Sequence, residues 1–352
     1  MKKLLVSLLA VVMLLAAFGC SAAPAPEATE APQTEQTPAA PEPTAAPEAT
    51  PVDYSQYKVA LLLPGTINDN GWNSAGYNAV ENLKTKYGVQ TAYTENIAAS
   101  DIEEFLRGYA TQGFQIVVCH GSQYIDYILK VAPEFPDTKF LISYGDEDKS
   151  QAPNVACVGP IETGFLAGAV AAAVSTKGSV AMLGGEESPS IKASVDLFEA
   201  GAKYINPDIK VYTGYIGTLT DADKAKEMAK TVISEHGADV IVGCANAAGM
   251  GVIQAAQEAG IYALGFNSDQ YNVAQDAVVV SILRNFNVMY DDVFQKIVNG
   301  TFEASLYPYG IAQGGTILSD WHGWDQKLPA ESIQKIEKMF QDFKDGKVTV
   351  ER

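Results

Sequence analysis

The loop that follows the first long apolar run carries polar side chains around one large aromatic residue. It contains Asn68, Asp69, Trp72 and Asn73. Amide and carboxylate groups can hydrogen-bond to a ligand, and an indole ring offers a flat face to a sugar or an aromatic ring. The segment therefore predicts contact with a polar, ring-shaped ligand. A structural role is the equal alternative, in which the Asn-Gly pair of the loop turns the chain, Asn73 caps a helix and Trp72 packs inward.

A second candidate segment follows the apolar run 115–119 and contains His120, Tyr124 and Asp126. These side chains can bind a ligand or cap the next helix, and the residues alone leave both interpretations open. Catalysis by His120 is not expected, because nothing nearby in the sequence supplies a nucleophile to work with it. The segment is a candidate for binding rather than for a reaction.

Two further loops at the ends of apolar runs complete the candidates. Asn246 lies in a loop that opens a helix, whose free amides suit an anionic or polar ligand. That loop lacks the lysine and the spacing of a phosphate loop, so ATP binding is not expected. Asn267 and Asp269 follow a later run, and a carboxylate there suits vicinal hydroxyls such as those of a ribose. A turn with a helix cap is the alternative role for this loop.

The elements that must position these loops alternate along the chain. Short apolar runs are separated by amphipathic stretches with helical spacing, which predicts parallel strands joined by crossover helices. Open parallel sheets bind ligands at the carboxyl ends of their strands, where all the candidate loops lie. Strands are expected at 58–63, 89–93, 115–119, 139–143, 155–158, 179–183, 210–215, 240–243, 262–266 and 278–283. Helices are expected at 74–87, 100–112, around 128–131, and at 165–174, 190–204, 221–236, 249–259, 288–298 and 330–345.

The expected fold class is α/β, with two doubly wound parallel-sheet lobes joined by a hinge. The helix at 288–298 comes after the second unit is complete, so we expect it to return to the first lobe. We also expect the helix at 100–112 to begin with a capping box formed by Ser100 and Glu103. The expected lobe boundaries are 53–159 with 285–312 for the first lobe, and 160–284 with 313–352 for the second.

The first 20 residues have the composition of a secretory signal peptide, with Lys2 and Lys3 before a short apolar run. The run ends in Ala-Phe-Gly-Cys at 17–20, which resembles a bacterial lipobox. We therefore expect a lipid on Cys20, with ordinary cleavage nearby as the alternative. Residues 21–52 are rich in Ala, Pro, Glu and Thr, and predict a disordered tether that holds the folded part away from a membrane.

Composition argues against several classes of function. The chain has 42 acidic and 24 basic residues, a formal charge of −18, and such a surface repels nucleic acid. Its three histidines are scattered and no cysteine lies within four residues of another, so no metal site is expected. Cys119 and Cys244 end apolar runs, which predicts buried thiols. We expect no cofactor.

The motifs together resemble the basic membrane protein family of bacterial transporter-associated lipoproteins, which includes purine nucleoside receptors. The resemblance covers nearly all of 57–345. Its landmarks are 68–73 (NDNGWN), 120–121 (HG), 131–137 (VAPEFPD), 164–168 (GFLAG) and 265–270 (GFNSDQ). The resemblance implies a type I periplasmic-binding fold that holds a ligand between its lobes and delivers it to an ABC permease.

The resemblance also implies roles for individual residues. The aromatic residue of the first loop stacks on a purine in that family, which corresponds to Trp72, and the acid of the later motif holds ribose, which corresponds to Asp269. Many members carry Asp where this chain has Asn267, and a lysine near the place of Arg284. Asn offers no charged acceptor, so a purine base or a related heterocycle is open alongside a nucleoside.

Capture of a purine-type ligand by hinge closure is therefore the expected function, in a monomeric, extracytoplasmic, lipid-anchored protein whose partners are a small molecule and ABC permease subunits. A sugar is the alternative ligand, because sugars use the same polar and aromatic side chains. A co-receptor that passes a signal to a chemoreceptor or a kinase is the alternative function. An enzyme is not expected, because no nucleophile and base can be assembled from the sequence.

Overall fold

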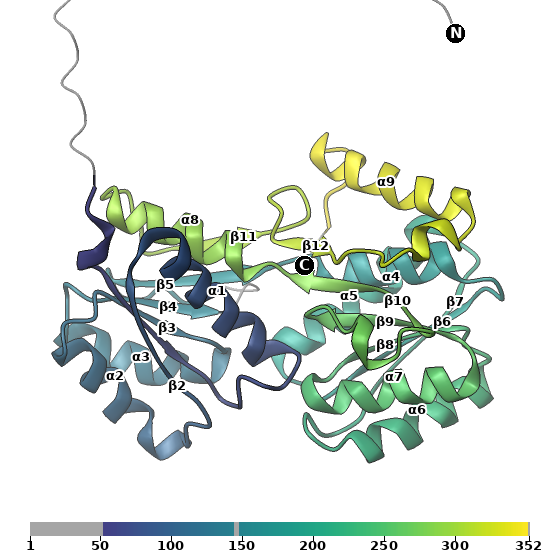
Figure 1. Ribbon diagram of the computed structural model, residues 1–352, viewed down its shortest axis with the longest axis horizontal. Coiled ribbons are helices and arrows are strands. Elements are labelled where there is room, and N and C mark those ends of the chain that lie inside the picture. The colour runs from purple at the N-terminus through teal and green to yellow at the C-terminus, as the bar shows by residue number, and fades with distance from the viewer. Residues whose placement is uncertain (1–51, 144–147, 351–352) are drawn as a thin grey trace, which may run out of the picture. The chain divides into compact units, whose positions relative to one another are not determined.

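The computed structural model describes residues 52–143 and 148–350. The expected signal peptide, Cys20 and the tether up to residue 51 lie outside this part of the chain. Within it, strands and helices alternate as the periodicity predicts and form two six-stranded sheets (Figure 1). Below, the first lobe is the first sheet with α1, α2, α3 and α8, and the second lobe is the second sheet with α4, α5, α6, α7 and α9.

The first sheet has the strand order β11-β5-β4-β3-β1-β2, and all its paired strands are parallel. Successive side chains of a strand point to opposite faces, so each buried strand contributes to two cores. Helices α1 and α8 cover one face, and α2 and α3 cover the other (Figure 1). The elements are β1 (Lys58–Leu62), α1 (Trp72–Tyr87), β2 (Gln90–Thr94), α2 (Ile102–Thr111), β3 (Ile116–Cys119), α3 (Ile125–Val131), β4 (Lys139–Ser143), β5 (Val155–Pro160), α8 (Phe286–Val298) and β11 (Leu306–Tyr309).

The second sheet has the order β12-β10-β9-β8-β6-β7, and β12 pairs with β10 in the antiparallel sense. Helices α4, α5 and α9 pack on one face, and α6 and α7 pack on the other (Figure 1). The elements are α4 (Thr163–Val174), β6 (Ser179–Gly184), α5 (Pro189–Ile205), β7 (Lys210–Tyr215), α6 (Ala222–His236), β8 (Val240–Cys244), α7 (Gly249–Ala259), β9 (Tyr262–Asn267), β10 (Val278–Arg284), β12 (Thr316–Leu318) and α9 (Ala330–Lys344).

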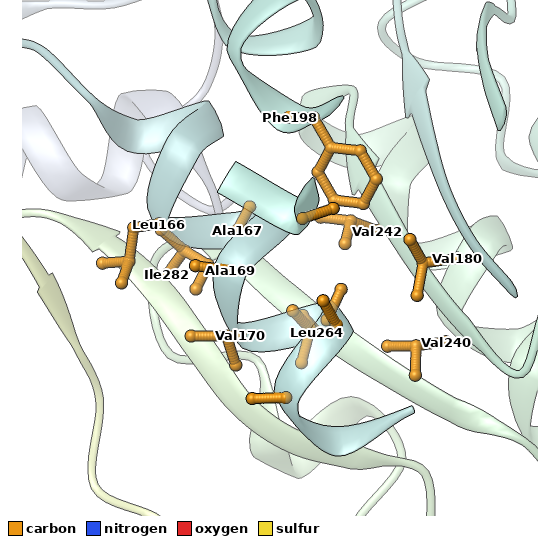
Figure 2. Close-up of a cluster of buried hydrophobic side chains, with 14 of the residues drawn as sticks. Leu166, Ala167, Ala169, Val170, Val180, Phe198, Val240, Val242, Leu264 and Ile282 are labelled. Carbon is orange, nitrogen blue, oxygen red and sulfur yellow. The ribbon is translucent and has the colours of Figure 1, made fainter. Parts of the chain in front are cut away.

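Helix α4 is buried along its whole length because it lies between the second sheet and α5. Figure 2 shows Leu166 and Val170 of α4 among side chains of the sheet, with Phe198 of α5 beside them. Although α4 is apolar on all sides, it has only 12 residues. Among residues 52–143 and 148–350, no helix combines the length and the apolar character needed to cross a membrane.

Glycines let α4 and α5 approach each other closely. A Cβ atom on Gly164 would lie 1.8 Å from the carbonyl oxygen of Ser194, and one on Gly168 would lie 1.9 Å from that of Phe198. Real Cβ atoms do not approach a carbonyl oxygen so closely, so larger side chains would push the helices apart. The position of α5 over the sheet therefore depends on these glycines.

The chain passes from one sheet to the other after β5, after β10 and between β11 and β12. Helix α8 packs on α1, on the face of the first sheet that the Phe286 and Phe294 side chains cover. The lobe boundaries 53–159 with 285–312, and 160–284 with 313–352, stay our proposal for where the hinge segments lie. These connections place the loops at the carboxyl ends of both sets of parallel strands beside each other.

Two features differ from the sequence-based expectations. Strands β11 and β12 had no recognisable signal, since the first contains a proline and the second has three residues. The capping box of Ser100 and Glu103 is wrong, because α2 begins at Ile102 and Ser100 belongs to a preceding 3-10 turn. The Ser100 hydroxyl donates to Asp101 Oδ1 at 2.7 Å, and Glu103 pairs with Arg107 at 3.0 Å instead of reaching back to the cap.

Candidate ligand-binding site

A cavity of about 740 Å³ lies between the loops of the two lobes. Its volume falls within the range of about 300 to 1,000 Å³ that is typical of sites for small molecules. The first lobe and the adjoining segment contribute Pro64, Trp72, Gly121, Ser122, Gln123, Ile125, Asp126, Leu129, Lys149 and Gln151. The second lobe contributes Glu186, Ser188, Pro189, Ser190, Ile191, Leu219, Cys244, Asn246, Asn267 and Arg284.

The structure brings five of the expected site residues together in this lining, namely Trp72, Asp126, Asn246, Asn267 and Arg284. The other six lie outside it. They are Asn68, Asp69, Asn73, His120, Tyr124 and Asp269. Contact between these six and a ligand stays a prediction, and the structure gives most of them partners within the protein.

Trp72 is fixed at the cavity by reciprocal hydrogen bonds with His120. The indole Nε1–H donates to the carbonyl oxygen of His120 at 3.0 Å, and Nε2 of His120 lies 2.8 Å from the carbonyl oxygen of Trp72. The imidazole also stacks on the indole, with ring centroids 4.2 Å apart, and Phe286 meets the indole edge-on. Hydrogen bonds and ring packing together hold the plane of the Trp72 ring.

His120 is a neutral, fully buried residue in this arrangement. Burial is the largest influence on its pKa and lowers it to about 3. Because a carbonyl oxygen can only accept, Nε2 carries the proton and Nδ1 is an acceptor. Nδ1 lies 2.7 Å from the Tyr290 hydroxyl and 3.0 Å from that of Ser143. His120 therefore has a structural role, which is to hold Trp72 in place through these contacts.

Asp69 organises the loop that leads into α1. Its carboxylate accepts hydrogen bonds from the backbone N–H groups of Gly71, Asn73 and Ser74 at 2.9 to 3.0 Å, and from Nδ2 of Asn73 at 2.7 Å. A negative charge at this position also suits the amino end of a helix. The Oδ1 atom of Asn73 accepts from the Gly65 N–H group at 3.2 Å. Asp69 therefore satisfies the first turn of α1, a role that the sequence analysis gave to Asn73.

Arg284 lies at the end of β10 and is 6% exposed. Its Nη2 atom donates to the Ser194 hydroxyl on α5 at 2.9 Å. The guanidinium carbon lies 5.2 Å from the centroid of the Trp72 ring and 5.4 Å from that of Phe266. Both distances suit a cation–π interaction. Arg284 thus brings a positive charge from the second lobe against the aromatic wall of the first.

Two asparagines that line the cavity adopt the left-handed backbone region. Their φ angles are 47° at Asn246 and 72° at Asn267. Asn tolerates this region better than most residues, and strained backbone gathers at functional sites. Asn267 is 4% exposed, and its Oδ1 atom has no hydrogen-bond partner among the described residues. A buried polar atom without a partner in the protein is rare, and a ligand group or a water molecule can supply the missing hydrogen bond.

The remaining expected residues have identifiable surroundings. Asp269 is exposed, and its Oδ2 atom lies 2.7 Å from Nε2 of His322. Tyr124 is buried in the core between the first sheet and α2 and α3, where its hydroxyl has no partner among the described residues. Asn68 is exposed at the loop surface.

Sequence reasoning missed the loop between β6 and α5 together with the first turn of α5, which supply Glu186 and 188–191 to the cavity. The signal was present, because this loop also follows a buried strand and leads into a helix through Ser188 and Pro189. It lacks an aromatic residue or an amide side chain, so it did not stand out by composition.

Three free cysteines are buried in the described part of the chain, at Cys119, Cys157 and Cys244. The prediction of buried thiols at Cys119 and Cys244 is confirmed. Burial raises the pKa of Cys157 and of Cys244 to about 11. A thiol in this state is a poor nucleophile and a poor metal ligand. No group of His, Cys, Asp and Glu side chains in residues 52–143 and 148–350 is placed to hold a metal ion.

Residues 56–344 match the family described as "ABC transporter substrate-binding protein PnrA-like", or Bmp. The chain belongs to this family. The resemblance to the basic membrane proteins is thereby confirmed, and the chain is a Bmp-family substrate-binding protein of an ABC transporter. Proteins of this class act outside the cytoplasm, where they take up a small molecule and interact with permease subunits.

Two relatives are similar to this chain over about three quarters of its length. The chain is 31% identical over 268 residues to the transcriptional activator protein med of Bacillus subtilis (strain 168). This alignment covers 75% of the chain and 82% of that protein. It is 28% identical over 262 residues to a purine-binding protein of Brucella abortus (strain 2308), and this alignment covers 73% of each chain.

A solved structure with the same fold is that of an ABC transporter solute-binding protein from Aeropyrum pernix K1. Its superposition on the Bmp structure has a TM-score of 0.73 at 18% identity, and it covers 83% of this chain and 92% of that chain. At this level of identity the likeness concerns the fold. The expected α/β fold of the type I periplasmic-binding class is confirmed by this match and by the two sheets of parallel strands.

Proposed function

We propose that this Bmp protein captures a purine-type ligand, a nucleoside or a free base, in the cavity between its lobes and passes it to an ABC permease. The observation that carries the proposal is Trp72, whose ring lies in the cavity wall and is held in one plane by His120. A flat, fixed aromatic surface favours a flat ligand ring and costs little conformational entropy on binding.

The polar edge of the ligand would meet side chains from both lobes. Asp126 accepts N–H or O–H groups, Asn246 and Asn267 offer amides, and Arg284 donates to ring nitrogens or carbonyl oxygens. The unpartnered Oδ1 atom of Asn267 would gain a donor from the ligand. The Arg284 guanidinium already lies over the indole. A ligand ring can therefore stack on Trp72 only if this guanidinium shifts, and the shifted group can then donate hydrogen bonds to the ligand.

A relative that is itself called a purine-binding protein supports this choice of ligand. Asn267 is neutral, so we favour a base or a nucleoside whose sugar is held without a charged acceptor at this position. The proposal includes a lipid anchor at Cys20, a tether to residue 52, a monomeric state and the absence of catalysis. Extraction of the mature protein into a detergent phase, and its mass, test the anchor directly.

A thermal-shift and calorimetry series tests the ligand assignment. Adenosine, inosine, guanosine, adenine and hypoxanthine are compared with ribose, glucose and galactose, because a ligand selective for the folded state raises the melting temperature. We expect a purine to bind, and Trp72→Ala to weaken it at least about 30-fold, as for a central aromatic contact. Trp321→Ala, which lies outside the cavity lining, is the matched control and keeps the affinity. Binding of sugars alone would contradict the purine assignment. Turnover of the bound ligand would contradict the proposal that the protein is not an enzyme.

A ligand-sensing co-receptor is the second candidate function. It is favoured by one observation, the 31% identity to a relative called a transcriptional activator. The two functions differ in what binds the liganded protein. Uptake of labelled purine that requires a permease supports transport, whereas a ligand-dependent signal that persists without the permease supports sensing.

A further inference from the structure

One of the contacts between the two lobes beside the cavity is made at a backbone carbonyl group. The carbonyl oxygen of Asn70 in the first lobe accepts a hydrogen bond from Ser268 Oγ at 2.5 Å and another from Gln270 Nε2 at 3.0 Å. Ser268 and Gln270 follow β9 in the second lobe. Trp72 and Asn267, which lie close to these residues in the sequence, line the cavity. The contact therefore joins the two walls beside the proposed ligand.

The acceptor side of this contact is held rigidly. Asn70 adopts a φ angle of 49°, and it lies between Asp69 and Gly71, whose N–H group donates to the Asp69 carboxylate at 2.9 Å. The same carboxylate binds the first turn of α1. Because the loop is closed by these bonds, the Asn70 carbonyl is presented to the second lobe without further ordering.

On the donor side, Gln270 is equally fixed. Gln270 is 3% exposed, its Oε1 atom accepts from the Phe266 N–H group at 2.9 Å, and its own N–H group donates to Ser281 Oγ at 3.0 Å. The bond at Oε1 determines which end of the carboxamide faces Asn70, since only Nε2 can donate to a carbonyl oxygen. Through its side chain and its backbone N–H group, Gln270 thus links the end of β9, β10 and the first lobe.

We propose that Ser268 and Gln270 are positioning residues for ligand binding, which form an interlobe latch on the Asn70 carbonyl and favour the closed arrangement before a ligand arrives. The inference rests on the proposed function in one respect, that the ligand is held between the lobes. Apparent affinity is the intrinsic affinity multiplied by the fraction of molecules that can bind. The latch therefore changes the affinity for every ligand by the same factor and leaves the preference among ligands unchanged.

Gln270→Glu is the sharpest variant, because it keeps the shape and the acceptor for the Phe266 N–H group and replaces only the donor to Asn70. The carboxylate then faces a carbonyl oxygen, which opens the latch. At about pH 5 a protonated, buried carboxyl can donate again, so the effect is partly reversed relative to the wild type at the same pH. Ser268→Ala removes the second donor at a less buried position, and Gln275→Glu makes the same chemical change at an exposed site as the control.

The full-length protein is measured without and with ligand. Spin labels on Lys84→Cys in α1 and Lys230→Cys in α6 report the distance between the lobes by pulsed electron resonance, and calorimetry gives the affinities for adenosine and adenine. We expect both latch variants to shift the unliganded distances to longer values, and the control to leave them unchanged. Affinity should fall about threefold to tenfold for Ser268→Ala and more for Gln270→Glu, by the same factor for both probes.

Unchanged distances in both unliganded latch variants would overturn the proposal, and so would a loss of affinity for one probe alone, which indicates direct contact. If neither probe binds the wild type, the purine assignment fails. The distances still decide whether the latch holds the lobes together, so the two failures are distinguishable.

Discussion

The two walls of the cavity are fixed by different kinds of interaction. In the first lobe, Trp72 is held by a buried polar pair with His120, which in turn bonds to Tyr290 and Ser143. In the second lobe, Arg284 is held by Ser194 on α5, and α5 is placed by glycines that bring backbone against backbone. The first wall therefore depends on a protonation state, and the second depends on helix spacing. Acidification and side-chain volume should each disturb one wall more than the other.

The largest expected effect concerns helix spacing. Gly168→Ala places a Cβ atom 1.9 Å from the Phe198 carbonyl oxygen, and we expect it to lower the free energy of unfolding by about 3 kcal/mol or more. Gly108→Ala on α2 is the matched control, because a Cβ there meets nothing within 4 Å. The control should raise the free energy by about 0.5 to 1 kcal/mol. Urea unfolding measures both, and equal effects would remove this contrast between the lobes.

The next effect concerns protonation of the first wall. Burial lowers the pKa of His120 to about 3, so the folded protein keeps the ring neutral while the unfolded chain takes up a proton below about pH 6.5. Stability contributed by this residue is present above that pH and is lost as the pH falls toward the folded pKa, by about 1.4 kcal/mol per pH unit.

His120→Gln removes this difference in proton uptake. We expect the variant to be less stable near neutral pH, because it loses the contacts with Trp72, but to lose less stability between about pH 6.5 and 5 than the wild type does, by about 2 kcal/mol. Urea unfolding across this range measures how the free energy of unfolding changes with pH in the two proteins. Equal slopes for the wild type and the variant would mean that His120 takes up a proton in the folded state as well.

The smallest effect concerns the hydroxyl that holds Arg284. Ser194→Ala removes the acceptor of the 2.9 Å bond from Nη2, and we expect the affinity for a purine probe to fall about fivefold. Ser234→Ala, at an exposed position on α6, is the control and should change nothing. A loss as large as that of Trp72→Ala would show that Ser194 binds the ligand itself.

Periodicity predicted most of the fold because buried parallel strands are continuous apolar runs and their helices are amphipathic. Strands β11 and β12 were not predicted, because they form by pairing with β5 and β10, which are distant in the sequence. The return of α8 to the first lobe was predicted from the order of elements together with the repeated crossings between lobes that two-lobed folds of this kind make. The wrong capping box shows the limit of a local motif, because the start of a helix also depends on how Ile102 packs.

The candidate site was predictable at the level of loops but not of side chains. The rule that ligands bind at strand ends selected the loops of Trp72, Asp126, Asn246 and Asn267. It could not distinguish Asp69 from Asp126, since both are acids that follow shortly after the end of a strand. The structure separates them, because Asp69 uses its oxygens on the amino end of α1, whereas Asp126 lines the cavity.

The three buried thiols have a consequence for the life of the protein after export. An unfolded chain outside the cytoplasm exposes Cys119, Cys157 and Cys244 to oxidants, and its thiols then have ordinary reactivity. Completion of β3, β5 and β8 encloses all three, and burial withholds the thiolate form. Folding is thus in kinetic competition with oxidation, because a thiol that is enclosed before it meets an oxidant stays reduced.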